Sequence, residues 1–263
     1  MEEYEAILAV FMRFLESDLS EDKEELFFQM ASLRSEFAIK TAIRGFGMEF
    51  DTAIELIREF DTSKLTAQEK AQRDIVLAAI DNLIDFATAE EYTMISELPE
   101  EYDIDNEDDY DILVSIFSKY NKTYAAVENA DIYYALEVAG LLYLLEDQTT
   151  LTYMTQQDER VRPWHRQYEG FTAMKKDFPH WLVPPIEHMC RCYLIEDERK
   201  TVFAKTASDT LEMPEWFNPT FKESIAFGGR IFSEEHPYFQ INESDAEYLD
   251  NIAKRIKNQY LNE

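Results

Sequence analysis

Hydrophobic residues recur at intervals of three and four over most of residues 3–146, which is the period of an amphipathic α-helix. The first predicted helix has one apolar stripe, formed by Tyr4, Ile7, Leu8, Phe11 and Leu15. A second helix is expected to begin at Ser20, a favourable N-cap residue, and to end at Gly45 and Gly47. A shorter helix is predicted over residues 51–60.

Longer helices are predicted further along this region. Thr66 and Glu69 have the spacing of a capping box, so a helix should follow them and continue to about residue 95. Two more helices are expected over residues 109–120 and 130–146. The second of these is apolar around nearly its whole circumference, which predicts that it is the central helix of the helical region.

The pattern changes after residue 148. Alternating, β-branched residues at 149–154 predict a strand, and two more short strands are expected at 190–195 and 200–204. An amphipathic helix is predicted over residues 244–260, near the end of the sequence, and it should pack against the rest. The second half should therefore mix short strands with helix.

Proline usage separates the two halves further. Seven of the eight prolines lie beyond Arg162, and Pro184 with Pro185 favours extended backbone. The sequence predicts an α+β fold in which an all-helical acidic N-terminal domain, residues 1–148, precedes a small irregular α+β domain, residues 149–263, with a C-terminal helix.

Charge limits the kind of partner. The formal net charge is −29, while 46% of the residues are hydrophobic, so the chain is a folded protein with an acidic surface and does not have the composition of a disordered one. An acidic surface repels phosphate backbones, which disfavours non-specific binding to nucleic acid. A partner with a basic face is expected instead.

The most acidic stretch, residues 97–111, raises the question of calcium binding. An EF-hand loop beginning at Asp103 would need glycine at its sixth position and glutamate at its twelfth. The chain has Asp108 and Val114 there, so a solvated acidic loop is favoured over a metal site.

Neither export nor membrane insertion is expected. The acidic start of the chain lacks the features of a signal peptide, and the longest apolar run, residues 138–145, is shorter than the roughly 20 residues that span a bilayer. Cys190 and Cys192 are too close together for a favourable disulfide, which fits a reducing compartment.

Histidine and cysteine are concentrated in one segment and suggest two interpretations. His165, His180, His188, Cys190 and Cys192 include the ligand types of a tetrahedral zinc site, and the alternate positions from His188 to Cys192 would lie on one side of an extended segment. Their spacing differs from that of common zinc fingers. We therefore favour small buried thiols and a structural histidine, with structural zinc at His165, Cys190 and Cys192 as the alternative.

The charged residues that precede His165 are interpreted as structural. Asp158, Arg160 and Arg162 mix both signs of charge, and arginine–carboxylate pairs commonly hold loops. No phosphate-binding glycine loop and no common hydrolase motif is present, so no catalytic residue and no enzymatic activity are predicted.

An ordered set of residues then suggests a family. The landmarks are Thr155, Asp158, Arg160, Val161, Arg162, His165, Gly170, Pro184, Pro185, Cys190, Arg191, Cys192, Asn218, Pro219, His236 and Pro237. In type and order they resemble the Mu F-like minor head proteins of tailed phages over about residues 151–239. The chain departs from the family pattern at Tyr168, Glu169 and residues 186–189, so the resemblance does not extend to His188.

The resemblance implies a minor capsid protein made in the host cytoplasm and incorporated into the phage head. It implies association with the portal or coat protein during head assembly or DNA packaging, with only indirect contact to packaged DNA and none to membrane. Docking is the expected mechanism, with Arg160, Arg162, His165, Cys190 and Cys192 holding the irregular domain together.

Two alternatives remain open. The first is a zinc-dependent hydrolase or nuclease-like enzyme that uses His165, Cys190 and Cys192. The second is an acidic interaction protein that mimics DNA, which would require carboxylates spaced like phosphates on one face.

Overall fold

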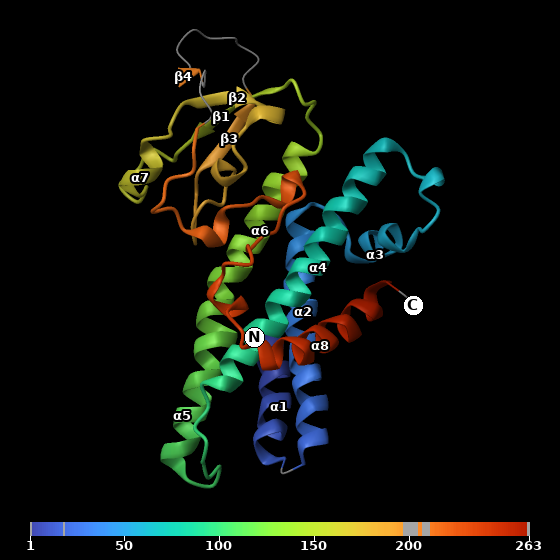
Figure 1. The fold of residues 1–263 in the computed structure, drawn as a ribbon, viewed down its shortest axis with the longest axis vertical. Helices are drawn as coiled ribbons and strands as arrows, with labels where there is room; N and C mark the ends of the chain where they lie inside the picture. Colours follow the sequence, from blue (N-terminus) through green and yellow to red (C-terminus); the bar gives the residue numbers. More distant parts are fainter. Residues whose placement is uncertain (1, 18, 197–204, 207–210, 262–263) are drawn as a thin grey trace. The chain divides into compact units, whose positions relative to one another are not determined.

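The computed structural model describes residues 2–17, 19–196, 205–206 and 211–261, and the predicted α+β class is confirmed (Figure 1). Long helices make up the first half of the chain, and a small sheet with several short helical turns follows. No helix among these residues has both the length and the apolar character needed to cross a bilayer.

Every helix predicted in the first half is present. The bounds are α1 Glu2–Glu16, α2 Ser20–Gly45, α3 Phe50–Arg58, α4 Ala67–Ser96, α5 Glu107–Ser118 and α6 Ala125–Leu142. The chain between α5 and α6 forms a π-helix over Lys119–Tyr124, where the sequence pattern had indicated a break after residue 120. The π-helix has no hydrophobic signature of its own, because it changes the hydrogen-bond register within an otherwise helical path.

The helix ends follow local chemistry. The predicted capping box is confirmed, because the Glu69 carboxylate accepts a hydrogen bond from the Thr66 backbone N–H at 2.7 Å and the Glu69 N–H donates to the Thr66 hydroxyl at 3.2 Å. At the end of α2, Gly47 has a φ of +79° and its N–H donates to the Arg44 carbonyl at 3.1 Å. The Met48 N–H reaches back five residues, which completes a Schellman motif.

Gly45 ends α2 as predicted and has a second role. A Cβ atom at this position would lie 2.3 Å from the backbone oxygen of Tyr133 in α6, so only glycine permits this approach of α2 to α6. The helix predicted to be central, α6, is exposed at its C-terminal end. Leu141 is 60% exposed, and Leu144, just beyond the helix, is 59% exposed.

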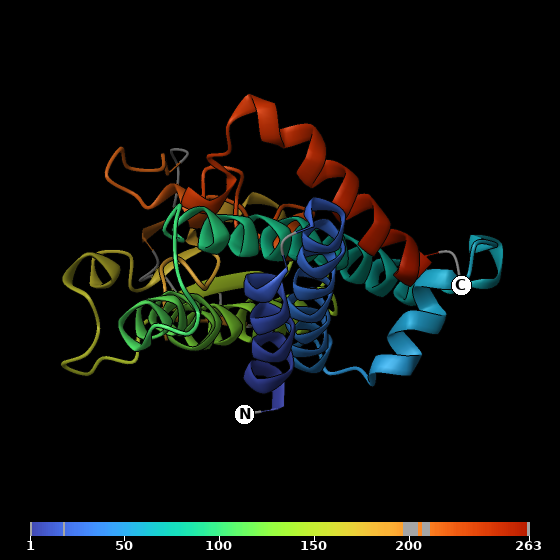
Figure 2. The same ribbon diagram turned by 90° about the horizontal axis from the view of Figure 1, so that it is seen from below.

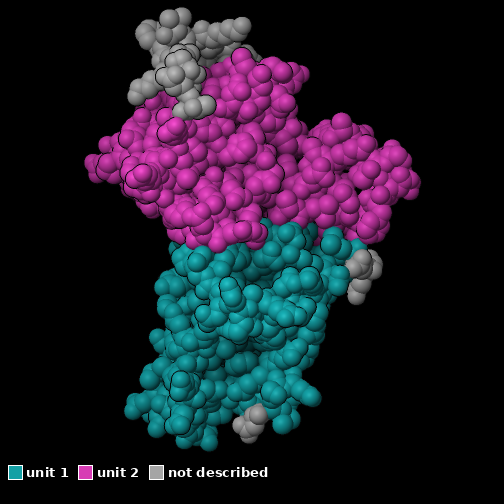
Figure 3. Space-filling view, in the orientation of Figure 1, with its two compact units in different colours: residues 1–41, 80–129, 236–263 teal, residues 42–79, 130–235 magenta. Residues whose placement is uncertain are grey.

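The residues pack into two compact units that alternate along the chain (Figure 3). Unit 1 contains residues 1–41, 80–129 and 236–263, and unit 2 contains residues 42–79 and 130–235. Helices α2, α4 and α6 each contribute residues to both units. This division describes packing, and the sequential boundary between residues 148 and 149 stays a prediction.

Unit 1 is a bundle of helices with an aromatic centre. The rings of Phe11 in α1 and Phe117 in α5 stack with their centroids 4.8 Å apart. The predicted C-terminal helix is α8, Glu243–Leu261, and it lies along α4 (Figure 2). Its direction is antiparallel to α4, because Asp245 accepts a hydrogen bond from Tyr92 at 2.6 Å while Lys257 pairs with Asp81 at 2.6 Å.

Unit 2 contains a small sheet with the strand order β3-β1-β2-β4. The strands are β1 Thr150–Met154, β2 Phe171–Met174, β3 Tyr193–Glu196 and β4 Lys205–Thr206. The central strand β1 is antiparallel to both β2 and β3, whereas β4 is parallel to β2. Short helical turns lie between and after the strands, namely α7 Pro163–Arg166, η3 Lys175–Asp177, η4 His180–Leu182, η5 Pro219–Phe221 and η6 Ile225–Phe227.

The strand predictions are only partly confirmed. The strand predicted at 149–154 is β1, but the one predicted at 190–195 begins only at Tyr193, after both cysteines. The strand predicted at 200–204 lies outside the described residues. Strand β2 was not predicted, because its four residues are too few to show a clear alternation.

A buried ionic cluster lies inside unit 1. The Arg34 side chain, 2% exposed, donates to Glu90 at 2.7 Å, to Glu128 at 2.9 Å and to Asn129 at 3.0 Å. Glu128 also accepts a hydrogen bond from the Tyr238 hydroxyl at 2.9 Å. One guanidinium therefore neutralises carboxylates from α4 and α6, and Tyr238 connects residues 236–263 to the same cluster.

Glu91 is the least compensated member of this region. Its side chain is fully buried, and among the described residues neither of its oxygens has a hydrogen-bond partner of good geometry. Burial is the main cause that raises the pKa of Glu91 to about 7, because a charged carboxylate is poorly solvated there.

Replacing Arg34 tests how much the ionic cluster contributes to the stability of the fold. We expect Arg34→Met to lower the free energy of unfolding by about 3–5 kcal/mol, because Glu90 and Glu128 would stay buried without a cation. The control is Lys40→Met on the same helix, whose exposed pair with Glu36 should matter by less than about 1 kcal/mol. Urea denaturation measures both, and equal effects of the two substitutions would contradict the role given to Arg34.

The raised pKa of Glu91 predicts a pH dependence. A carboxyl with a higher pKa in the folded state stabilises the fold below its unfolded pKa and loses that contribution as pH rises through about 7. Glu91→Gln should therefore be more stable than the parent at about pH 8, by on the order of 1–3 kcal/mol, and gain little at about pH 5. The exposed Glu5→Gln serves as control, and a gain for Glu91→Gln that does not change with pH would refute the prediction.

Candidate functional site

Three of the predicted site residues converge in unit 2. His165 lies on the short helix α7, which Pro163 opens at a position where its missing N–H costs nothing. Cys190 and Cys192 lie in the irregular segment that leads into β3. One ring nitrogen of His165 and the two sulfurs all lie within 4.8 Å of one another.

The side chains of this group lie close together and are buried from solvent. His165 Nδ1 lies 3.2 Å from the sulfur of Cys192 and 3.9 Å from the sulfur of Cys190. The exposed fractions are 2% for His165, 6% for Cys190 and 2% for Cys192. Among the described residues it is the one group with histidine, cysteine or carboxylate atoms close enough to hold a metal ion.

The expectation that His188 lies on the same side as the cysteines is wrong. Met189 has a φ of +57°, so the segment turns there and is not extended. Asp131 fixes the turn, because it pairs with His188 at 2.8 Å and accepts the Met189 N–H at 2.7 Å. His180 is also apart from the group, stacked on the ring of Phe227.

Glu187 is the residue of this site that the sequence analysis missed. One of its oxygens lies 3.2 Å from His165 Nε2, 3.1 Å from the Trp164 indole nitrogen and 3.1 Å from Arg162 Nε. It therefore orients the imidazole so that Nδ1 faces the sulfurs. Glu187 lies within the stretch that departs from the family pattern, and an isolated glutamate between isoleucine and histidine carries no signal of its own.

Two of the three charged residues before His165 make ion pairs, Asp158 with Arg191 and Arg162 with Glu187. Arg191 donates two hydrogen bonds to the Asp158 carboxylate, at 2.8 and 2.7 Å, and these bonds are the main cause that lowers the pKa of Asp158 to about 2. Arg162 also donates to the backbone oxygen of His188 at 2.9 Å. The Arg160 side chain is exposed, and only its backbone N–H bonds to Asp158.

The remaining landmarks shape the backbone. Gly170 has a φ of +79° and donates its N–H to the Tyr153 carbonyl at 2.8 Å. Pro185 is buried and follows a cis peptide bond. Asn218 caps η5, with Pro219 as the first residue of that turn. In unit 1, His236 and Pro237 make the same kind of cap for the turn η7, Pro237–Phe239.

The two thiols differ in their acid–base properties. Hydrogen bonding to Cys192 and burial raise the pKa of the Cys190 thiol. The same hydrogen bond, donated by Cys190, lowers the pKa of Cys192, and Arg191 and Arg162 add to the effect. Cys192 is therefore the sulfur that more readily becomes a thiolate, the form that binds metals and attacks electrophiles.

A series of side-chain contacts runs from Cys192 through His165 to Glu187. It has the connectivity of a nucleophile, a base and an orienting carboxylate. A substrate would have to reach the sulfur, however, and the side chains of Cys192 and His165 are almost completely enclosed. His165 and Cys192 can instead hold a metal ion together with Cys190, or these side chains can pack as a buried polar network without entry of any substrate.

Comparison with protein-family models, curated proteins and solved structures gives no match to this chain. The resemblance to Mu F-like head proteins therefore rests on the ordered landmarks alone.

Glu187 contacts three neighbouring side chains, and its substitution tests whether these contacts stabilise the site. We expect Glu187→Ala to lower the free energy of unfolding by about 2–3 kcal/mol, because the buried His165 Nε2 would lose its partner. Glu159→Ala is the control, since this exposed glutamate lies in the same unit. Chemical denaturation compares the two, and a loss no larger than that of the control would show that Glu187 does not support the site.

Proposed function

We propose that this protein is a minor head component of a tailed phage that associates with the portal vertex during head assembly or DNA packaging. The observation that carries the proposal is the ordered set of landmarks from Thr155 to Pro237, which resembles the Mu F-like family. A building part of a capsid needs a stable shape and no reaction centre, so the role of the landmarks in the fold bears on the proposal.

The contacts of the landmarks support a structural role. Asp158 is tied to Arg191, Arg162 to Glu187, and His165 to both Glu187 and Cys192. These pairs connect segments that are up to 33 residues apart and have few backbone ladder bonds. Side-chain pairs of this kind fix an irregular module in one conformation.

The acidic surface of unit 1 supports association with a basic partner. The exposed carboxylates of this region belong to Glu97, Glu100, Glu101, Asp103, Asp105, Glu107, Asp108 and Asp111. The loop is held by its own bonds, because the Asp109 carboxylate accepts the Asp103 N–H at 2.9 Å and Asn106 caps α5. Tyr110 and Ile112 are exposed on α5 next to the loop, and they add the apolar contact that a protein partner requires.

The enzyme alternative is less well supported. A zinc-dependent hydrolase needs an open coordination position that a substrate can reach, and the three side chains that could hold zinc are between 2% and 6% exposed. The DNA-mimic alternative has no specific observation in its favour. The portal-associated role is therefore the function that we propose.

Neutralising the acidic loop tests the proposed docking. The variant Glu100→Gln, Glu101→Gln, Asp105→Asn and Asp108→Asn removes four exposed charges, none of which accepts a hydrogen bond that holds the loop. We expect it to bind the portal protein encoded with this chain about tenfold more weakly at low salt, because each exposed charge contributes modestly. Titration calorimetry at low and moderate salt measures the affinity.

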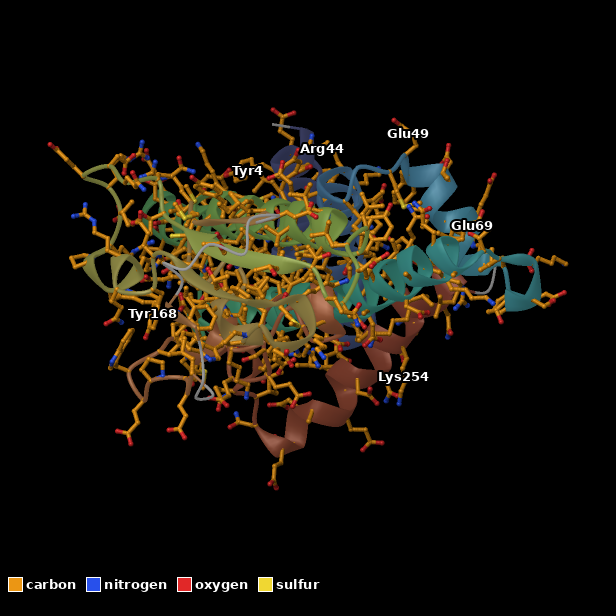
Figure 4. All side chains as sticks on the ribbon, turned by 90° about the horizontal axis from the view of Figure 1, so that it is seen from above. Tyr4, Arg44, Glu49, Glu69, Tyr168 and Lys254 are labelled. Atoms are coloured by element: carbon orange, nitrogen blue, oxygen red, sulfur yellow. The ribbon has the colours of Figure 1, made fainter. Side chains whose placement is uncertain are left out.

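The matched control neutralises four exposed carboxylates elsewhere, at Glu49, Asp51, Glu55 and Asp74. Figure 4 shows Glu49 projecting from the ribbon. The control should bind the portal protein like the parent chain. If the parent chain itself shows no association at low salt, the proposed function is wrong; if both variants weaken binding equally, the acidic loop is not the docking surface.

A further inference from the structure

We propose that His165, Cys190 and Cys192 hold a structural zinc ion in unit 2, through Nδ1 of the histidine and the two sulfurs. This site is independent of the proposed function, since a zinc ion can stabilise a protein of any role. The inference rests on the arrangement of donor atoms, on the partner of the histidine and on the buried Tyr153 hydroxyl beside the sulfurs.

The donor atoms have the spacing of a tetrahedral site. Zinc binds sulfur at about 2.3 Å and imidazole nitrogen at about 2.0–2.1 Å, which places neighbouring donors roughly 3.5–3.8 Å apart. The two nitrogen–sulfur distances, 3.2 and 3.9 Å, lie on either side of this spacing. Both nitrogen–sulfur distances reach this spacing with shifts of a few tenths of an ångström, and all three donor atoms lie within 4.8 Å of one another. Two thiolates and an imidazole also form a donor set that favours zinc over hard cations such as calcium or magnesium.

The ring nitrogen of His165 that would not bind the metal, Nε2, has a carboxylate partner. Metal-binding imidazoles usually donate the second ring N–H to a carboxylate, and His165 Nε2 lies 3.2 Å from Glu187. With the proton on Nε2, the lone pair of Nδ1 faces the sulfurs. Arg162 and Trp164 hold the Glu187 oxygen in place, so the imidazole cannot easily rotate away.

A tetrahedral ion needs a fourth donor, and Tyr153 provides an oxygen for it. Its hydroxyl is buried beside the two thiols, and it faces the Cys192 thiol without good hydrogen-bond geometry. A buried hydroxyl without a well-formed hydrogen bond is costly, so an interaction with the ion, direct or through one bound water, would satisfy it. The strand β1 that carries Tyr153 is the centre of the sheet, and the site would connect β1, α7 and the segment before β3.

The test uses the full chain with zinc and cobalt as probes. We expect close to one zinc per chain by elemental mass spectrometry, and none after Cys190→Ser with Cys192→Ser. The control variant is His180→Asn, which replaces an exposed histidine and should keep the zinc. Glu187→Gln should weaken zinc binding about 10–100-fold, the range for loss of a carboxylate partner of a metal-binding histidine.

Cobalt keeps the test valid if a variant fails to fold. Chelator-treated parent protein that retains its helical circular dichroism should develop thiolate-to-cobalt absorption when Co²⁺ is added, and Zn²⁺ should abolish it. Removal of zinc should also lower the melting temperature of the parent chain and leave that of the cysteine variant unchanged. Folded parent protein that contains no zinc, gives no cobalt absorption and has two freely titrating thiols would overturn the proposal.

Discussion

Side chains, more than backbone ladders, determine the conformation of the segment between β1 and β3. Backbone groups in such a segment still need partners, and unpaired buried ones are expensive. The chain solves this problem with a few carboxylates that each accept several donors. Asp131 holds the turn at Met189, Asp158 holds Arg191, and Glu187 orients the imidazole of His165. The candidate site exists because these three acids fix the segments that carry it.

Carboxylates therefore serve two physical roles in one very acidic chain. On the surface they remain ionised and repel other anions, whereas inside they require a cation or a proton. Arg34 is the cation in unit 1, where Glu90 and Glu128 share it. Glu91, one residue further along α4, is left with burial as its dominant influence. The abundance of acids thus has a structural cost that one arginine only partly offsets.

The helical half could be predicted from sequence for two reasons. The helical period of hydrophobic residues repeats over long segments, as in α1, and Thr66 and Glu69 form a local capping signal at the start of α4. The π-helix at Lys119–Tyr124 and the close approach at Gly45 could not, since both depend on contacts between helices. In the site, the ligand types of His165, Cys190 and Cys192 suggested that these residues could lie together, and they do converge. The separation of His188 and the role of Glu187 depend on Asp131 and on a positive φ at Met189, which no periodicity reveals.

The alternation of the two units along the chain has a consequence for shortened versions of the protein. A cut between residues 148 and 149 would separate residues 42–79 from most of unit 2 and residues 236–263 from the other parts of unit 1. Tyr238 would then leave the Arg34 cluster, and α8 would leave α4. Neither fragment would contain all the strands and helices of one core, so the polypeptide has to be made whole before either part can complete its interior.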